Sequence, residues 1–330
     1  MVKLGFVAKL PEDVVFFRQA RQGLFFLASD LIKQRPTRVF IIPSYTCPTV
    51  PKAIEQAGGR CIYVDLSDDL DIDLVDLQEV TRGISEEDWV ILATQLFGAP
   101  IRDYKQLYPN AIVIEDRCQG LYAKESNANY QLLSFGAGKM ISISGGGALV
   151  GLNLSANEIS CLSKQGYING FIQFAMTYMQ KVVLENRIIY FMMSPVITYL
   201  IKSRFDDGPI AVELLNPILA RWAWWGVLRG HHGKRSDCAD RWMSALNEMK
   251  DFNLQNGIPL LRLPIARRFS LGAIFDGASY AETVEKAELS RGKNFKIANK
   301  LQNSTLLPCH PGVTSRYMQC VLGDISNSLG

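Results

Sequence analysis

The sequence predicts an α/β protein, with a mostly parallel sheet covered by helices on both faces in a large first part and a smaller α/β part after it. Over about the first 150 residues, short apolar runs that end in polar residues or glycine alternate with helix-like segments. Buried parallel strands and their crossover helices give this pattern. The length, 330 residues, favours a second, smaller part. The composition, 48% hydrophobic and 20% charged, excludes disordered and collagen-like classes.

Four apolar runs are the candidate strands of the large sheet, and helical segments lie before and between them. The runs are RVFIIPSY, RCIYVDL, WVILATQLFG and AIVIEDRCQG. The segments 17–32, 48–56 and 101–107 are the candidate helices, and ALVG near residue 150 is a further strand. We expect this α/β part to contain most of residues 1–153.

Residues 165–202 are strongly apolar, but Lys181, Glu185 and Arg187 interrupt them. The run that remains, 188–201, is shorter than the roughly 20 residues of a membrane span. We expect buried helices or a subunit interface here. Peripheral contact of residues 171–201 with a membrane surface is the alternative.

The domain boundary is predicted after this segment, which gives a large domain 1–205 and a small domain 206–330. Residues 213–228 and 236–252 are candidate helices, the second with Ser236 as its N-cap. IPLLRLPI is a candidate strand, 286–301 a candidate helix, and LLPCHPGV a strand end and turn.

Charge and cysteine content exclude several classes of function. The 35 Lys and Arg nearly balance the 32 Asp and Glu, so no strong field favours nucleic acid. Seven cysteines without a CxxC pair, and three histidines, argue against a disulfide framework or a metal site. Charged residues such as Lys3 and Lys9 exclude a secretory signal at the start, so we expect a cytoplasmic protein.

The candidate catalytic and binding residues lie mainly between positions 94 and 150. Asp116 ends an apolar strand, which places its carboxylate at the carboxyl edge of the sheet, where open α/β folds bind ligands. Lys139 follows among small residues, before a Gly-Gly-Gly run. A single lysine of this kind is usually a surface cation, and the glycine run lacks the GxGxxG spacing of a dinucleotide site.

The pairing of the two residues favours pyridoxal 5′-phosphate. A lysine that forms a Schiff base and an aspartate that keeps a pyridine nitrogen protonated are the two protein groups this cofactor needs. Ser134, five residues before Lys139, has a hydroxyl for the phosphate. Gly136 and Gly138 let the backbone approach it.

Five segments in order resemble the DegT/DnrJ/StrS-type aminotransferases of nucleotide-sugar biosynthesis, which are fold-type-I pyridoxal-phosphate enzymes. The match covers about the first 150 residues well and the last 120 or so loosely. The segments are IIPSYTCPTVPKAIEQAGGRCIYVDL, TQLFGAPIRDYKQL, IEDRCQG, SFGAGKMISISGGGALV and STLLPCHPGVTS.

The resemblance implies a role for each matching residue. Lys139 would carry the cofactor and shuttle the proton, and Asp116 would pair with the pyridine nitrogen. Gln119 would contact the ring-oxygen side of the cofactor, and Ser134 its phosphate. Relatives that dehydrate sugars carry histidine in place of the lysine, so Lys139 favours transamination.

Three further positions depart from the family pattern. Gln22 and Gly23 fall on the phosphate turn, where a Thr is usual at the first position. Cys47 stands where an aromatic residue stacks on the cofactor, with Tyr45 nearby. Gln95 replaces a histidine. The family's NYR segment is missing, and FDDGPIAVELLNPILARW takes its place.

The resemblance implies transfer of an amino group from glutamate to a nucleotide-linked keto-sugar, for surface polysaccharide or related glycan biosynthesis, by a homodimer. Two alternatives stay open. One is another fold-type-I activity, a lyase or a non-sugar aminotransferase, because the small-domain motif is missing. The other is a catalytically silent relative that binds the cofactor.

Overall fold

The computed structural model describes most of the chain. The described residues are 10–136, 139–143, 145–154, 156–166, 168–170, 172, 175, 208–229, 232–246, 252–255, 258, 260, 262–266, 275–276, 280–309, 313 and 315–327. Apart from two residues, the apolar segment 171–201 lies outside them, as does the predicted domain boundary at 205, so neither prediction is tested.

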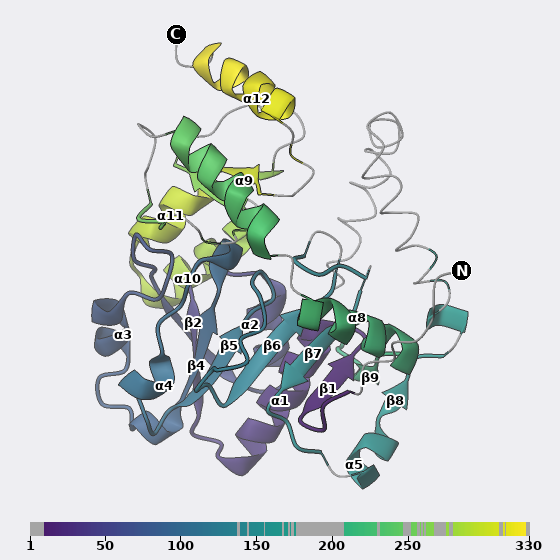
Figure 1. The fold of residues 1–330 in the computed structure, drawn as a ribbon. Helices are drawn as coiled ribbons and strands as arrows, with labels where there is room; N and C mark the ends of the chain where they lie inside the picture. Colours follow the sequence, from purple (N-terminus) through teal and green to yellow (C-terminus); the bar gives the residue numbers. More distant parts are fainter. Residues whose placement is uncertain are drawn as a thin grey trace, which may run out of the picture.

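A large, mostly parallel sheet forms the centre of the molecule (Figure 1). Its parallel strands β2–β6 are flanked by β7 and β1, which run antiparallel to their neighbours. The described strands, in spatial order, are β3 (Arg60–Val64), β2 (Val39–Pro43), β4 (Trp89–Thr94), β5 (Ile112–Asp116), β6 (Tyr130–Ser134), β7 (Gly147–Val150), β1 (Val14–Phe17), β9 (Glu213–Leu214) and β8 (Ser163–Lys164). The predicted α/β class is confirmed, and the four predicted runs are β2–β5.

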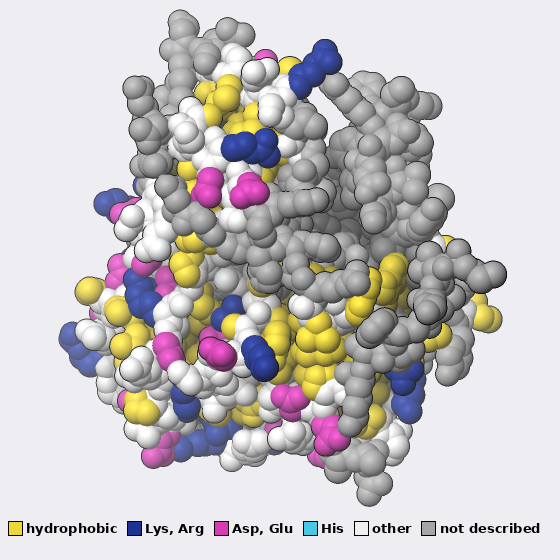
Figure 2. Space-filling view, in the orientation of Figure 1, with side chains coloured by type: hydrophobic (Ala, Val, Ile, Leu, Met, Phe, Trp, Pro, Cys, Tyr) yellow, Lys and Arg dark blue, Asp and Glu magenta, His cyan; other side chains and the backbone are white. Residues whose placement is uncertain are grey.

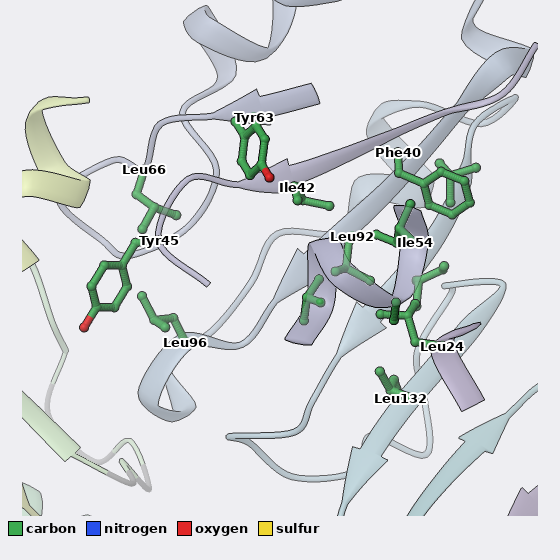
Figure 3. Close-up of a cluster of buried hydrophobic side chains, with 14 of the residues drawn as sticks. Leu24, Phe40, Ile42, Tyr45, Ile54, Tyr63, Leu66, Leu92, Leu96 and Leu132 are labelled. Atoms are coloured by element: carbon green, nitrogen blue, oxygen red, sulfur yellow. The ribbon is translucent and has the colours of Figure 1, made fainter. Parts of the chain in front are cut away.

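Helices cover both faces of this sheet because its strands are apolar on both sides. Phe40 and Ile42 of β2 pack with α1 (Ala20–Gln34) and α2 (Thr49–Gln56). Ile41, between them, faces α3 (Leu74–Val80) and α4 (Tyr104–Leu107). Figure 3 shows Ile54 of α2 beside Phe40 and Leu92 on the first of these faces.

The second face continues under α8 (Pro217–Arg229), which packs on β1, β6 and β7. Strand β9 and α8 therefore lie with the large sheet, although both follow residue 205 in the sequence. Short elements complete this part: η1 (Glu86–Asp88), η2 (Leu96–Gly98) and α5 (Ala156–Cys161). No described helix reaches the length and apolarity that crossing a bilayer requires.

A smaller antiparallel sheet forms the second part, in the order β10 (Arg262–Ile265), β12 (Thr305–Pro308), β11 (Phe275–Asp276). Helices α9 (His232–Ala245) and α12 (Ser315–Asn327) pack against it around the buried Trp242. Ser236 lies inside α9, so its prediction as an N-cap is wrong.

The predicted helix 286–301 is two helices, α10 (Ala281–Arg291) and α11 (Lys296–Gln302). Gly292 ends α10 in the left-handed conformation, with φ of 62°, which glycine adopts without steric cost. The periodicity of apolar residues continues across this break, and it therefore suggested a single helix.

Polar contacts join the two parts at the end of β3. The Asp65 carboxylate accepts hydrogen bonds from the backbone N–H groups of Ile297 and Ala298, at the start of α11, at 3.3 and 3.2 Å. Asp76 of α3 forms ion pairs with Arg291 and Lys293. These contacts hold α10 and α11 beside the edge strand of the large sheet.

Candidate active site

Asp116 lies at the carboxyl edge of the large sheet, as predicted. It is the last residue of β5, is 4% exposed, and pairs in register with Thr94 of β4 and Leu132 of β6. Its Oδ1 atom accepts a hydrogen bond of 3.0 Å from the backbone N–H of Cys118. Because the chain turns immediately after β5, the carboxylate has a fixed position at the edge where ligands bind.

Lys139 lies in a tight loop between β6 and β7. The backbone N–H groups of Phe135 and Ile143 donate to Gly146 and Phe135, each at 2.9 Å, and close the loop. A Cβ atom added at Gly136 would lie 3.7 Å from the Ser134 Oγ and 3.9 Å from the Lys139 Cγ. The loop therefore brings Lys139 and Ser134 to the same end of β6. Gly138 lies outside the described residues.

The Cys118 thiol is close to both charged groups. Burial raises its pKa well above the usual value, the Asp116 carboxylate raises it further, and the Lys139 ammonium opposes the rise. Cys47, which follows β2, also contributes to the rise. The thiol therefore stays protonated, and the charges of Asp116 and Lys139 both act on it.

The start of α1 lies against the end of β6. Ser134 pairs with Gly147 of β7, and a Cβ atom at Gly147 would lie only 2.4 Å from the Cα of Ala20, the first residue of α1. Ser134 and the N-terminus of this 15-residue helix are thus neighbours. Backbone N–H groups and the helix dipole favour an anion at such a position.

Gln22 and Gly23 lie in the first turn of α1, but their side chains have structural partners. The Gln22 amide accepts from the Gln19 N–H at 3.2 Å and donates to the Ala211 carbonyl at 2.5 Å. A Cβ atom at Gly23 would lie 2.9 Å from the Phe17 ring. Any contact of this turn with a phosphate would therefore come from the helix backbone rather than from the Gln22 side chain.

Gln95 is held by its neighbours after β4. Its Oε1 accepts from the Arg117 guanidinium at 3.3 Å and from the Leu121 N–H at 3.1 Å. Gly120 is required here, because a Cβ atom would lie 1.7 Å from this oxygen. Arg117 is fixed in turn by a 2.8 Å ion pair with Glu115.

Gln119 connects the site to the smaller sheet, a contact that sequence reasoning missed. Its Nε2 donates to the hydroxyl of Tyr280 at 3.2 Å, and its Oε1 accepts from the Phe97 N–H at 3.3 Å. Tyr280 is 161 residues away in sequence and precedes α10. No local pattern around Tyr280 could have revealed this contact.

The described residues fit pyridoxal 5′-phosphate. A buried carboxylate, a lysine, a serine hydroxyl beside a helix N-terminus and a glutamine amide converge on one edge of the sheet. They supply an acceptor for a ring N–H, an amine for a covalent bond and donors for a phosphate.

A family model matches this part of the chain. Residues 23–183 match the DegT/DnrJ/EryC1/StrS aminotransferase family. The match covers just under half of the chain and supports the resemblance that its motifs indicate. The match includes six of the seven predicted site residues and ends before the smaller sheet. Gln22 lies one position outside it.

Solved structures share the fold of this chain over nearly its whole length. A putative sugar aminotransferase from Streptococcus pneumoniae, in its PMP form, has a TM-score of 0.56 and 14% identity, covering 98% of this chain and 93% of that one. A putative PLP-dependent aminotransferase from Bacillus cereus has a TM-score of 0.63 and 15% identity, over 95% and 85%. The aminotransferase PseC of Helicobacter pylori, involved in the biosynthesis of pseudoaminic acid, has a TM-score of 0.57 and 14% identity, over 95% and 86%. No curated protein matches the sequence significantly.

All seven predicted site residues are described, and their roles stay predictions. Asp116, Gln119, Ser134, Lys139 and Cys47 gather around the sheet edge. Tyr45 does not take the place of an aromatic residue in the open site, because it is fully buried between the rings of Phe97 and Tyr280.

Proposed function

We propose that this protein is a pyridoxal-phosphate-dependent aminotransferase that moves an amino group from glutamate to a nucleotide-linked keto-sugar for glycan biosynthesis. The observation that carries the proposal is that Asp116 ends β5 at the carboxyl edge of the sheet, while Lys139 lies beside Ser134 in the loop that follows the neighbouring strand β6. When bound, the cofactor would supply an electron sink for the carbanion that transamination requires.

Asp116 would accept a hydrogen bond from the pyridine nitrogen and keep the proton on it. The hydrogen bond from the Cys118 N–H orients the carboxylate, and burial in the sheet strengthens its electrostatic effect. A neutral side chain of the same shape would not hold that proton. Asp116 is therefore the residue on which we expect turnover to depend most, after the lysine.

Lys139 would bind the cofactor covalently through its Nζ atom and then act as acid and base. Its amino group, when free, would take a proton from the reacting carbon of the substrate and return it as an acid. Backbone hydrogen bonds close the loop between β6 and β7 at its ends, so the backbone from which the Lys139 side chain extends is fixed. Lysine at this position favours transamination over dehydration.

The remaining residues would bind and orient the cofactor. Ser134 and the backbone at Gln22 and Gly23 would meet the phosphate at the start of α1, and Gln119 would donate to the ring oxygen. Cys47 would lie on the face of the ring, where its thiol cannot stack as an aromatic residue would.

The substrate class and the homodimer are part of the same proposal. The putative sugar aminotransferase and PseC support a sugar substrate. In support of a dimer, α8 exposes Ile218, Trp222 and Leu228, and hydrophobic side chains gather over its face in Figure 2. The cytoplasmic location stays a prediction.

Absorbance and chemical trapping test the proposal directly. The protein purified with pyridoxal 5′-phosphate should show a visible or near-ultraviolet band that glutamate changes, and borohydride should fix the cofactor on a peptide containing Lys139. Nucleotide-linked keto-sugars and small keto acids are then compared as acceptors. No trapped lysine would refute the proposal. Turnover only with small keto acids would favour the alternative of a non-sugar enzyme.

A further inference from the structure

The amide of Gln119 is fixed by one group from each part of the molecule. A backbone N–H can only donate, so the 3.3 Å contact with Phe97 identifies the Gln119 oxygen. The Gln119 nitrogen must then face Tyr280, whose hydroxyl accepts at 3.2 Å. The nitrogen carries two hydrogens, and the contact with Tyr280 uses one of them.

The backbone of Phe97 adopts an uncommon conformation to make its contact. Its φ of 54° and ψ of 12° lie in the left-handed region, which is rare for a bulky residue. The turn is held by a 2.9 Å hydrogen bond from the Gln95 N–H to the Asp116 carbonyl. Such backbone conformations are concentrated at functional sites, where the surrounding structure maintains them.

Tyr280 is suited to be a neutral acceptor. Burial raises the pKa of its phenol well above the usual value; neighbouring Cys47, Tyr45 and Asp116 add to the rise, and Arg262 opposes it. Its ring packs on Tyr45, with 5.1 Å between centroids. Figure 3 shows Tyr45 at the margin of the buried cluster, beside Leu96.

We propose that Tyr280 is a positioning residue, through which the smaller sheet and its helices set the direction of the Gln119 amide toward the ring oxygen of the cofactor. The proposal rests on the proposed function, because it requires Gln119 to face the cofactor. With the Gln119 oxygen held by Phe97 and one hydrogen held by Tyr280, the second hydrogen has a single direction. Without the hydroxyl, the amide can rotate about its last torsion and the hydrogen bond to the ring oxygen weakens.

Tyr280→Phe tests this because it removes the hydroxyl and keeps the ring against Tyr45. The dissociation constant of pyridoxal 5′-phosphate should rise by about 2- to 10-fold, as the loss of one neutral hydrogen bond gives. The pH midpoint of the absorbance of the bound cofactor should move upward, because a donor to the negatively charged ring oxygen favours its deprotonated form. A structural role alone would not move this midpoint.

Tyr63→Phe is the matched control. Tyr63 is 2% exposed, and its hydroxyl is buried without a hydrogen-bond partner among the described residues. Removing that hydroxyl should leave cofactor affinity and the pH midpoint unchanged.

A double-mutant cycle gives the decisive comparison. Gln119→Ala should move the midpoint in the same direction, and Tyr280→Phe should add nothing in that background. Additive shifts, or a wild-type midpoint in Tyr280→Phe, would overturn the proposal. If the wild-type protein fails to bind the cofactor, the proposed function itself is wrong, and this outcome is distinct because it is seen without any substitution.

Discussion

The ion pairs of Asp76 should stabilise the folded protein, because they hold α10 and α11 against the large sheet. Asp76 is 6% exposed and accepts two hydrogen bonds from the Arg291 guanidinium, at 2.9 and 3.0 Å. It also pairs with Lys293 and accepts the Asp65 N–H at 2.8 Å. Asp76→Asn keeps the shape of the side chain and removes the charge that both cations share.

The expected loss of stability is about 2–3 kcal/mol. Removing one partner of a buried pair usually costs about 3–5 kcal/mol, because the other charge is left uncompensated. Here the Lys293 side chain is 34% exposed, and Glu79 lies 3.9 Å from both cations, so water and Glu79 reduce the cost. Most of the expected loss of stability comes from Arg291, because only 14% of its side chain is exposed.

Urea unfolding of wild type and variant at several pH values is the assay. Burial raises the pKa of Asp76, but hydrogen bonds from Lys293, the Asp65 backbone and Arg291 outweigh burial and hold this pKa below its usual value. Its contribution is therefore complete above about pH 4, the unfolded value, and is lost as pH falls through the lower folded value. Burial raises the pKa of Asp65 and Asp71, so the difference between wild type and variant is compared rather than the wild-type curve alone. This difference includes the effect of the Asp76 charge on Asp65, whose pKa it raises.

Glu55→Gln provides the matched control, since it removes another ion pair between the two parts. The Glu55–Lys286 pair is exposed, at 38% and 44% of the side chains, and should contribute less than about 1 kcal/mol. Equal losses for the two variants at pH 7, or a loss for Asp76→Asn that does not diminish as the pH falls below about 4, would refute the reasoning.

Three further predictions concern the site and the assembly. Lys139→Ala should abolish borohydride trapping of the cofactor while the circular dichroism spectrum stays that of the wild type; turnover at the wild-type rate would contradict the assignment. Asp116→Asn should keep cofactor binding but lower turnover by orders of magnitude. The neutral amide would lose electrostatic stabilisation of the transition state on the order of several kcal/mol. Light scattering should give the mass of a dimer, and a fully active monomer would exclude the interface.

The sequence was sufficient for the parallel centre of the large sheet, and the reason is physical. Strands buried on both faces are continuous apolar runs, and β2, β4 and β5 are such runs. The edge strand β3 is less buried at its start but keeps an apolar run. Strand β6 was missed because Tyr130 and Gln131 interrupt the apolar pattern at its start. The break between α10 and α11 was missed because one glycine ends the first helix without changing the periodicity.

In the candidate site too, residues with a local sequence signal could be predicted, and contacts between distant residues could not. Asp116 and Lys139 could be predicted because each has a local signal, a strand end or a set of small flanking residues. Tyr280 could not be predicted, because its contact depends on how the smaller sheet packs against η2. Gln22 was placed on the phosphate turn, but the contact of its side chain with the Ala211 carbonyl, a partner far away in sequence, had no local signal.

Substitution of Gly147 should affect both the stability of the fold and the binding of the cofactor. A Cβ atom at Gly147 would lie 2.4 and 2.5 Å from the Cα and N atoms of Ala20, so Gly147→Ala must push the start of α1 away from the end of β6. Backbone cannot rotate out of the way as a side chain can, so the variant should lose about 1–3 kcal/mol of stability. It should also bind pyridoxal 5′-phosphate more weakly, because Ser134 and the helix N-terminus would separate.

Gly59→Ala distinguishes these two effects, since its Cβ atom would also be crowded, though less closely, far from the site. That atom would lie 2.8 Å from the Ile54 Cγ2 and 3.0 Å from the Phe40 Cε2, on the buried face between α2 and β2. Both variants should unfold at lower urea concentration, but only Gly147→Ala should raise the dissociation constant of the cofactor under conditions in which each variant is folded. If Gly59→Ala weakened cofactor binding equally, the effect would come from stability alone, and the start of α1 would not be the place where the phosphate binds.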